Sequence, residues 1–155
     1  MREAKCSIAN AYVELGRLEE ALVIQREAYA GMMKFQKRHT QDTLVLLFNL
    51  FNTLIKMRKV AEAVKLLRDE DALQNAESAF GSEDLFFLTL SGGYATAVLD
   101  SPDATRDDMK KAMEISERAY RTMCRVSGTN HPRTLEAKSE MQRARRYLAI
   151  RGISI

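Results

Sequence analysis

Apolar residues recur along the chain at intervals of three and four, the spacing that places them on one face of an α-helix. The first two stretches show this rhythm at Ile8, Ala9, Tyr12, Leu15, Leu18, Ala21, Leu22, Ala28 and Tyr29. Small residues such as Ala9 and Ala21 would let antiparallel helices approach closely, while Leu22 would fill the space between layers. We therefore expect these positions to form the core of a packed helix pair.

Residues that break secondary structure are few, with 7 Gly and 2 Pro in 155 residues. This scarcity favours helices joined by short turns. The pattern predicts seven helices, at about residues 2–15, 18–36, 41–57, 60–79, 83–99, 105–126 and 131–150. The fold class expected from the pattern is therefore all-α.

The sequence also repeats itself, which indicates a solenoid of similar units. A shift of 42 positions (21 to 63) pairs Leu18 with Val60, Glu20 with Glu62 and Ala21 with Ala63. A shift of 91 positions (21 to 112) pairs Ala21 with Ala112, Ile24 with Ile115, Ala28 with Ala119 and Tyr29 with Tyr120. We expect three units, at about residues 2–36, 41–79 and 83–126, followed by a capping helix at 131–150.

Two segments depart from the repeat. Residues 65–72 hold two extra positions, which predicts a kink or a partly unwound turn in the fourth helix. The turn at residues 100–108 is longer than its counterparts, and Ser101, Asp103 or Thr105 could cap the sixth helix.

The segment "GTNHPRTL", residues 128–135, raises the question of whether His131 serves chemistry or marks a helix start. Thr40 and Asp84 occupy the same position in the other copies, so no chemical group repeats there. Gly128 suits a helix end, and Pro132 is tolerated in a first helical turn. We interpret His131 as a helix-start residue, because a ligand or base would need converging partners.

Composition and motifs narrow the range of functions that we expect. The longest apolar run, residues 43–55, is interrupted by Asn49 and Asn52, so it predicts a buried helix and not a membrane span. No secretory signal pattern opens the chain, which favours an intracellular, cytoplasmic setting, and Cys6 and Cys124 are expected to be free thiols. We expect no metal, no cofactor and no catalysis, because phosphate loops, ligand spacings and nucleophile motifs are missing.

The segment "IANAYVELGRLEEALVIQREAY" resembles a tetratricopeptide repeat, which it matches at Tyr12, Leu15, Gly16, Ala21 and Ala28. The longer spacing and "GTNHPRTL" are similar to repeats of the kinesin light chain type. The second unit departs from the pattern, with Phe51 for a small residue and Arg58 for the turn glycine. The resemblance implies a right-handed superhelix (α-solenoid) whose first helices line a concave groove that binds proteins.

Mapped onto this chain, the resemblance implies a groove lined by residues of all three first helices. The residues expected to bind a partner are Asn10, Val13, Val45, Phe48, Asn49, Asn52, Ile55, Thr96 and Leu99. An amide side chain such as Asn49 offers a donor and an acceptor to a peptide backbone. The alternative is that Asn49 and Asn52 bond neighbouring helices. Cys6, Thr89 and Gly93 replace the cations of a carboxylate clamp, so we predict no carboxylate-clamp binding. Gly92 and Gly93 suggest close backbone approach by a helix or a ligand.

The last helix is expected to cap the array, with one apolar stripe at Leu135, Met141, Ala144 and Leu148. Its other side would form a basic surface, at Arg143, Arg145, Arg146 and Arg151. We favour a solvated face there over an acidic partner, and we disfavour RNA binding.

Two functions remain in view. The first is a non-catalytic interaction module that binds a peptide or helix of a protein partner in its groove. The alternative is a structural subunit, or a fragment of a longer array, that can also self-associate through exposed apolar surface.

Overall fold

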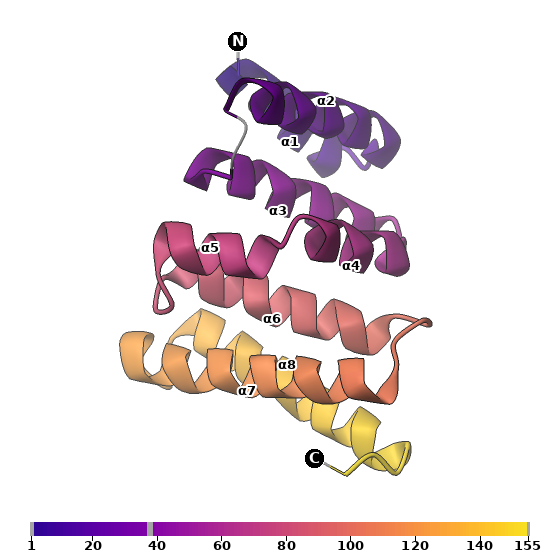
Figure 1. Cartoon of the computed structure of the whole chain (residues 1–155), viewed down its shortest axis with the longest axis vertical. Helices are drawn as coiled ribbons and strands as arrows, with labels where there is room; N and C mark the ends of the chain where they lie inside the picture. The colour runs from indigo at the N-terminus through magenta and orange to yellow at the C-terminus, as the bar shows by residue number, and fades with distance from the viewer. Residues whose placement is uncertain (1, 37–38, 155) are drawn as a thin grey trace. The chain divides into compact units, whose positions relative to one another are not determined.

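The computed structural model describes residues 2–36 and 39–154, with side chains from residue 7 onward, and these residues form helices joined by turns (Figure 1). The helices are α1 (Arg2–Glu14), α2 (Leu18–Gln36), α3 (Gln41–Lys56), α4 (Val60–Asp69), α5 (Ala72–Phe80), α6 (Leu85–Asp100), α7 (Arg106–Ser127) and α8 (Pro132–Ile150). The predicted all-α class of an α-solenoid is confirmed. The prediction of seven helices is wrong, because the described residues form eight.

The chain divides into two compact units, Met1–Ala79 and Phe80–Ile155. In the first unit α1 pairs with α2, α2 packs on α3, and α3 pairs with α4 (Figure 1). The centre of this core comes from α3, whose Leu44, Leu47, Leu50 and Leu54 are at most 2% exposed. The aligned Ala21 and Ala63 are fully buried, which lets neighbouring helices approach as the repeat predicts.

Two positions of the predicted core in the first hairpin lie on the surface. Ala9 is buried as expected, but Ile8 is 48% exposed and Leu15 is 71% exposed. Leu15 follows the last residue of α1 and belongs to the turn, while Ile8 points to a different side of α1 from Ala9. The core prediction is therefore wrong for these two residues.

The turns of the two N-terminal hairpins share one backbone geometry. After α1 the amide of Arg17 donates to the Tyr12 carbonyl at 2.8 Å, and after α3 the amide of Lys59 donates to Leu54 at 2.9 Å. The residue before each donor has a left-handed backbone, with φ of 74° at Gly16 and 60° at Arg58. Arg58 thus keeps the repeat's turn in a conformation that favours glycine.

The predicted irregularity in the fourth helix is a complete break. α4 ends at Asp69 and α5 begins at Ala72, with Asp71 in a left-handed conformation at φ 47°. The Asn75 amide side chain donates to the Glu70 carbonyl at 3.0 Å and satisfies a backbone acceptor that the break exposes. The extra residues are absorbed by ending one helix and starting another, not by bending a single helix.

In the second unit α6 pairs with α7, and α8 packs on both (Figure 1). Its core includes Ala95, Ala112, Met113 and Leu148, each at most 1% exposed. Of the three candidate caps before α7, Thr105 acts: its hydroxyl accepts from the Asp108 amide, and the Asp108 carboxylate accepts from the Thr105 amide. The pair forms a capping box that fixes the start of α7.

The start of α8 answers the question raised by His131. Gly128 ends α7 with φ 86°, and the His131 imidazole Nδ1 accepts from the Arg133 amide at 3.3 Å as the cap of α8. Pro132 occupies the first turn, where its missing donor is not needed. The interpretation of His131 as a helix-start residue is confirmed.

The apolar stripe of α8 differs from the prediction at one end. Met141, Ala144 and Leu148 are buried, as expected. Leu135 is 48% exposed, whereas the preceding Thr134 is 1% exposed. The first turn of α8 therefore directs Thr134 inward, and the assignment of Leu135 to the stripe is wrong.

Candidate functional site

The predicted groove residues of the first unit lie mainly along α3. Val45 is 40% exposed, and Phe48, Asn49, Asn52 and Ile55 are half-buried. We call these five residues the α3 stripe. Positions 45, 48, 49, 52 and 55 follow helical spacing, so they share one side of α3 while the leucines described above fill the other. The Phe48 ring stacks on Phe51, with 6.1 Å between ring centroids.

The asparagines of the α3 stripe keep their amides free. The side chains of Asn49 and Asn52 make no hydrogen bond to any other described residue, although the Asn49 backbone carbonyl accepts from Thr53 at 3.0 Å. The alternative in which these amides bond neighbouring helices thus has no contact among the described residues to support it. On α1, Asn10 is exposed and Val13 is half-buried, while the side chains of Glu3 and Cys6 lie outside the described residues.

The groove positions of the second unit face α8. Thr96 is half-buried and its hydroxyl donates to the Glu140 carboxylate at 3.5 Å. Leu99 is only 4% exposed, because α8 covers this part of α6. Leu99 therefore presents only a small apolar surface, and its role as a partner contact stays a prediction.

Long charged side chains of α8 reach across to small polar groups of α6. Arg133 donates to the Thr89 hydroxyl at 3.3 Å, and Arg143 forms an ion pair with Asp100 at 3.4 Å. A Cβ added at Gly92 would meet only the Glu140 carboxylate, at 4.0 Å. Close backbone approach therefore does not explain Gly92, whose nearest neighbour is the flexible end of a side chain.

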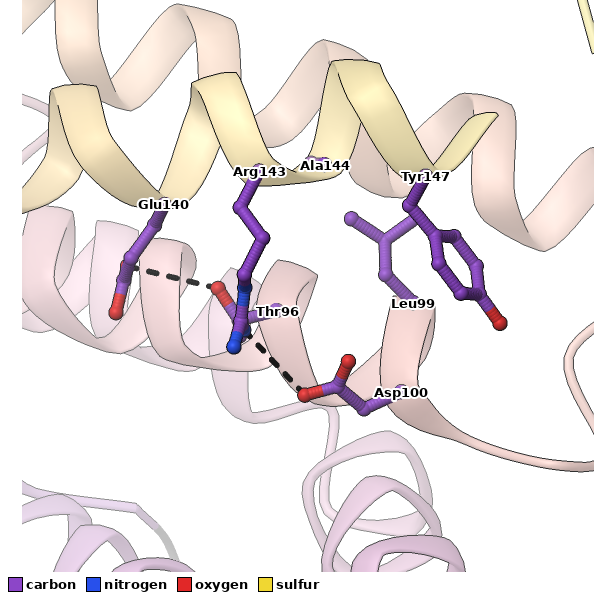
Figure 2. Close-up of a pocket in the computed structure, with 7 residues that line it drawn as sticks. All are labelled: Thr96, Leu99, Asp100, Glu140, Arg143, Ala144 and Tyr147. Atoms are coloured by element: carbon purple, nitrogen blue, oxygen red, sulfur yellow. Dashed lines mark hydrogen bonds and ion pairs between the residues drawn. The ribbon is translucent and has the colours of Figure 1, made fainter. Parts of the chain in front are cut away.

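These two helices enclose a small pocket of about 80 Å³. Its lining residues are Thr96, Leu99, Asp100, Glu140, Arg143, Ala144 and Tyr147. Figure 2 shows Glu140 and Arg143 extending from α8 toward Thr96 and Asp100 on α6, with the Tyr147 ring beside Leu99 on the other side. We call it the α6–α8 pocket. Its lining combines the apolar side chains of Leu99 and Ala144, the aromatic ring of Tyr147 and the charged groups of Asp100, Glu140 and Arg143.

Glu140 is the least compensated charge of the α6–α8 pocket. Burial raises the pKa of its carboxyl, and the nearby Glu136 carboxylate raises it further, while Arg143 and the Thr96 hydrogen bond act in the opposite direction. Glu140 forms no ion pair with any described residue, because the Arg143 guanidinium is paired with Asp100. The surroundings of Glu140 therefore disfavour the ionised form of its carboxyl.

The predicted basic surface is partly neutralised. Arg143 pairs with Asp100, and Arg145 donates to the Glu117 carboxylate from Nε at 3.1 Å. The Arg151 guanidinium lies 4.4 Å from the centroid of the Tyr147 ring, in a cation–π contact, while Arg146 is exposed. The four arginines therefore do not form one continuous free cationic patch.

The sequence analysis missed Asp100, Glu140 and Tyr147 as parts of a site. A signal was present, because positions 140, 143, 144 and 147 follow the spacing of one helix face. Arg143 was assigned to the outer side of α8, which separated it from these neighbours. Only the packing of α8 on α6 shows that Asp100 is its partner.

Three general features of the described residues bear on the function of the chain. They contain no group of three or more His, Cys, Asp or Glu side chains arranged to hold a metal ion. Within the same residues, every helix is too short or too polar to span a bilayer. Cys124 is a free thiol, as expected.

Antiparallel helix pairs with shared turn geometry define a helical repeat protein. Residues 3–31, which cover most of α1 and α2, match the family model described as tetratricopeptide repeat. The first hairpin is therefore a tetratricopeptide repeat, and such repeats generally mediate protein–protein interactions. The comparison with curated proteins found no matching relative. The kinesin light chain subtype stays a prediction.

Proposed function

We propose that the chain is a non-catalytic interaction module, and that it binds a peptide or helix of a protein partner along the α3 stripe. The supporting observation is the pair of amides at Asn49 and Asn52, which bond no described residue and lie beside the exposed Val45 on one side of α3. An extended backbone could bond both amides while its side chains contact Val45 and Ile55. The three repeat units, the groove through Asn10 and Val13, and the cytoplasmic setting belong to the same proposal.

Site-specific photo-crosslinking in cells tests this proposal. A benzoyl-phenylalanine introduced at Val45 should form adducts with a discrete partner, whereas the same group at the exposed Gln74 of α5 should not. The double substitution Asn49→Ala, Asn52→Ala should weaken adduct formation at least about tenfold, because each lost hydrogen bond to a ligand is worth about 1 kcal/mol or more. Gln74→Ala, Gln142→Ala removes two exposed amides elsewhere and serves as the matched control. Equal adduct yields in both double variants would refute groove binding.

Exposed apolar side chains favour the second candidate, a subunit of a larger assembly. Leu15 is 71% exposed, Val23 is 57% exposed and Phe35 is 88% exposed, all in the first unit. Sedimentation velocity over a range of protein concentrations separates the two functions. A monomer throughout supports the interaction module, whereas concentration-dependent association that Leu15→Lys, Val23→Lys abolishes supports the assembly subunit.

A further inference from the structure

We infer that the α6–α8 pocket binds a lysine or arginine side chain of a protein partner, with Arg143 occupying the cation's place until the partner arrives. The inference rests on the proposed function only in assuming that the ligand belongs to a protein. It assigns a different surface from the α3 stripe, and it gives the partner a chemistry that the basic sequence of α8 does not suggest.

The charge of the pocket favours a cation. Its lining carries two carboxylates, Asp100 and Glu140, against one guanidinium, Arg143, so the lining has a net charge of −1. Glu136 adds a further negative charge next to Glu140. Of the neighbouring arginines, Arg145 is engaged by Glu117 outside the pocket, Arg151 lies against the Tyr147 ring, and Arg146 is exposed and does not line the pocket. A partner's cation would therefore meet an excess of negative charge despite the basic composition of the helix.

The shape of the pocket suits an amphipathic side chain. Leu99 and Ala144 contribute apolar groups to the lining, and Figure 2 shows the Tyr147 ring beside Leu99. Lysine and arginine both carry an apolar stem behind a charged head, and such stems pack on apolar surface while the head stays polar. The stem would lie mainly against the Tyr147 ring, and the head would reach the carboxylates of Asp100 and Glu140.

The bond between Arg143 and Asp100 is weak enough to be exchanged. The two groups are 3.4 Å apart, and their side chains are 63% and 52% exposed. Exposed ion pairs of this kind contribute little free energy. A partner's cation could therefore take over Asp100 while Arg143 turns outward, and it would also compensate Glu140, which no described residue pairs.

Nuclear magnetic resonance titration of the full chain with three blocked tripeptides tests the inference. The probes are acetyl-Gly-Lys-Gly-amide, acetyl-Gly-Arg-Gly-amide and acetyl-Gly-Glu-Gly-amide. The lysine and arginine probes should shift the methyl signals of Leu99 and Ala144, and the glutamate probe should not. Because the probes replace the unidentified partner, this result is independent of the crosslinking at Val45, and either proposal can fail alone.

Three variants test whether the pocket binds a cation and not an anion. Asp100→Asn with Glu140→Gln should weaken binding of the cationic probes about tenfold or more, since hydrogen bonds to charged groups are worth about 1.5–3 kcal/mol. Arg143→Ala should strengthen it, because the competing cation is gone. Arg146→Ala removes an exposed arginine of the same helix and should leave binding within about twofold of wild type. The inference is overturned if the glutamate probe binds and Arg143→Ala abolishes that binding, or if no probe shifts these methyl groups at tens of millimolar.

Discussion

At the scale of single residues, two glutamates of the second unit have opposite electrostatic surroundings. Glu117 accepts hydrogen bonds from Arg145 and Arg121, and the Arg145 bond is the main reason that its pKa is lowered. Burial is the main reason that the pKa of Glu140 is raised. The folded state therefore favours the anion of Glu117 and disfavours the anion of Glu140.

We expect the substitutions Glu117→Gln and Glu140→Gln to change stability in opposite directions at pH 7. A lowered folded pKa stabilises the protein above the ordinary glutamate pKa, and that contribution is lost as pH falls through the folded value. A raised folded pKa destabilises it above that range, and the penalty disappears on acidification. Glu117→Gln should therefore lower the free energy of unfolding and Glu140→Gln should raise it, as measured by urea denaturation between pH 3.5 and 7. Equal signs for the two variants would contradict this assignment.

Two threonines at equivalent positions of the repeat differ in their hydrogen bonding. The Thr43 hydroxyl donates to the Thr40 carbonyl at 2.9 Å and accepts from the Thr40 amide at 2.7 Å, whereas the buried Thr134 hydroxyl has no partner among the described residues. Replacing Thr43 by the isosteric Val should cost about 1–2 kcal/mol of unfolding free energy, because a cap is lost. Thr134→Val should leave stability unchanged or raise it by up to about 1 kcal/mol. Thermal and urea denaturation of both variants give the comparison, and a larger loss for Thr134→Val would reverse the assignment.

At the scale of elements, the turns after α1 and α3 provide a matched pair for testing backbone strain. Arg58 occupies the left-handed conformation that Gly16 has in the first turn, and a Cβ at Gly16 would meet nothing within 4 Å. We expect Arg58→Gly to raise the free energy of unfolding by about 0.5–1 kcal/mol and Gly16→Ala to lower it by about 1 kcal/mol. Both changes in stability are expected because a positive φ is unfavourable for a residue with a Cβ atom. Denaturant titrations in which Arg58→Gly destabilises the chain would indicate that the arginine side chain makes a compensating contact.

The same turns show how far the sequence predicts elements. Periodicity and self-alignment placed α2 at residues 18–36, as observed, and paired Gly16 with Arg58. The break at Asp71 was expected only as a kink or an unwound turn, because two extra residues do not say whether a helix bends or ends. Thr134 was not predicted to be a core residue. The cap can rotate the first turn of a helix and bury a different side chain, while the apolar pattern of the sequence stays the same.

The candidate site was less predictable than the fold. The residues of the α3 stripe were named in advance because the resemblance to a tetratricopeptide repeat implies them, and they lie on one side of a single helix. The α6–α8 pocket depends on which side chains of two different helices meet, and the spacing along α8 indicates only the residues of that helix. Leu99 was expected to line the groove and is 4% exposed, and Arg143, which was expected to belong to a basic surface, forms an ion pair with Asp100.

At the scale of the whole molecule, each compact unit of this helical chain has its own buried centre. Leu54 of α3 is 1% exposed in the first unit, and Leu148 of α8 is fully buried in the second. In repeat proteins stability is approximately a sum of local and nearest-neighbour contributions. A cavity made in one unit should therefore act mainly on the helices of that unit.

We expect Leu54→Ala and Leu148→Ala each to cost about 2–5 kcal/mol, the usual range for truncating a buried leucine. The loss of stability should be larger in the unit that carries the substitution, because the lost contacts belong to the core of that unit. Native-state hydrogen exchange with mass spectrometry should show the larger loss of amide protection in residues 7–79 for Leu54→Ala, and in residues 80–154 for Leu148→Ala. Leu135→Ala, at a leucine of α8 that is 48% exposed, serves as the control and should change protection little in either unit. Equal loss of protection in both units from either core substitution would mean that the chain opens as one cooperative structure, and that local contacts do not dominate its stability.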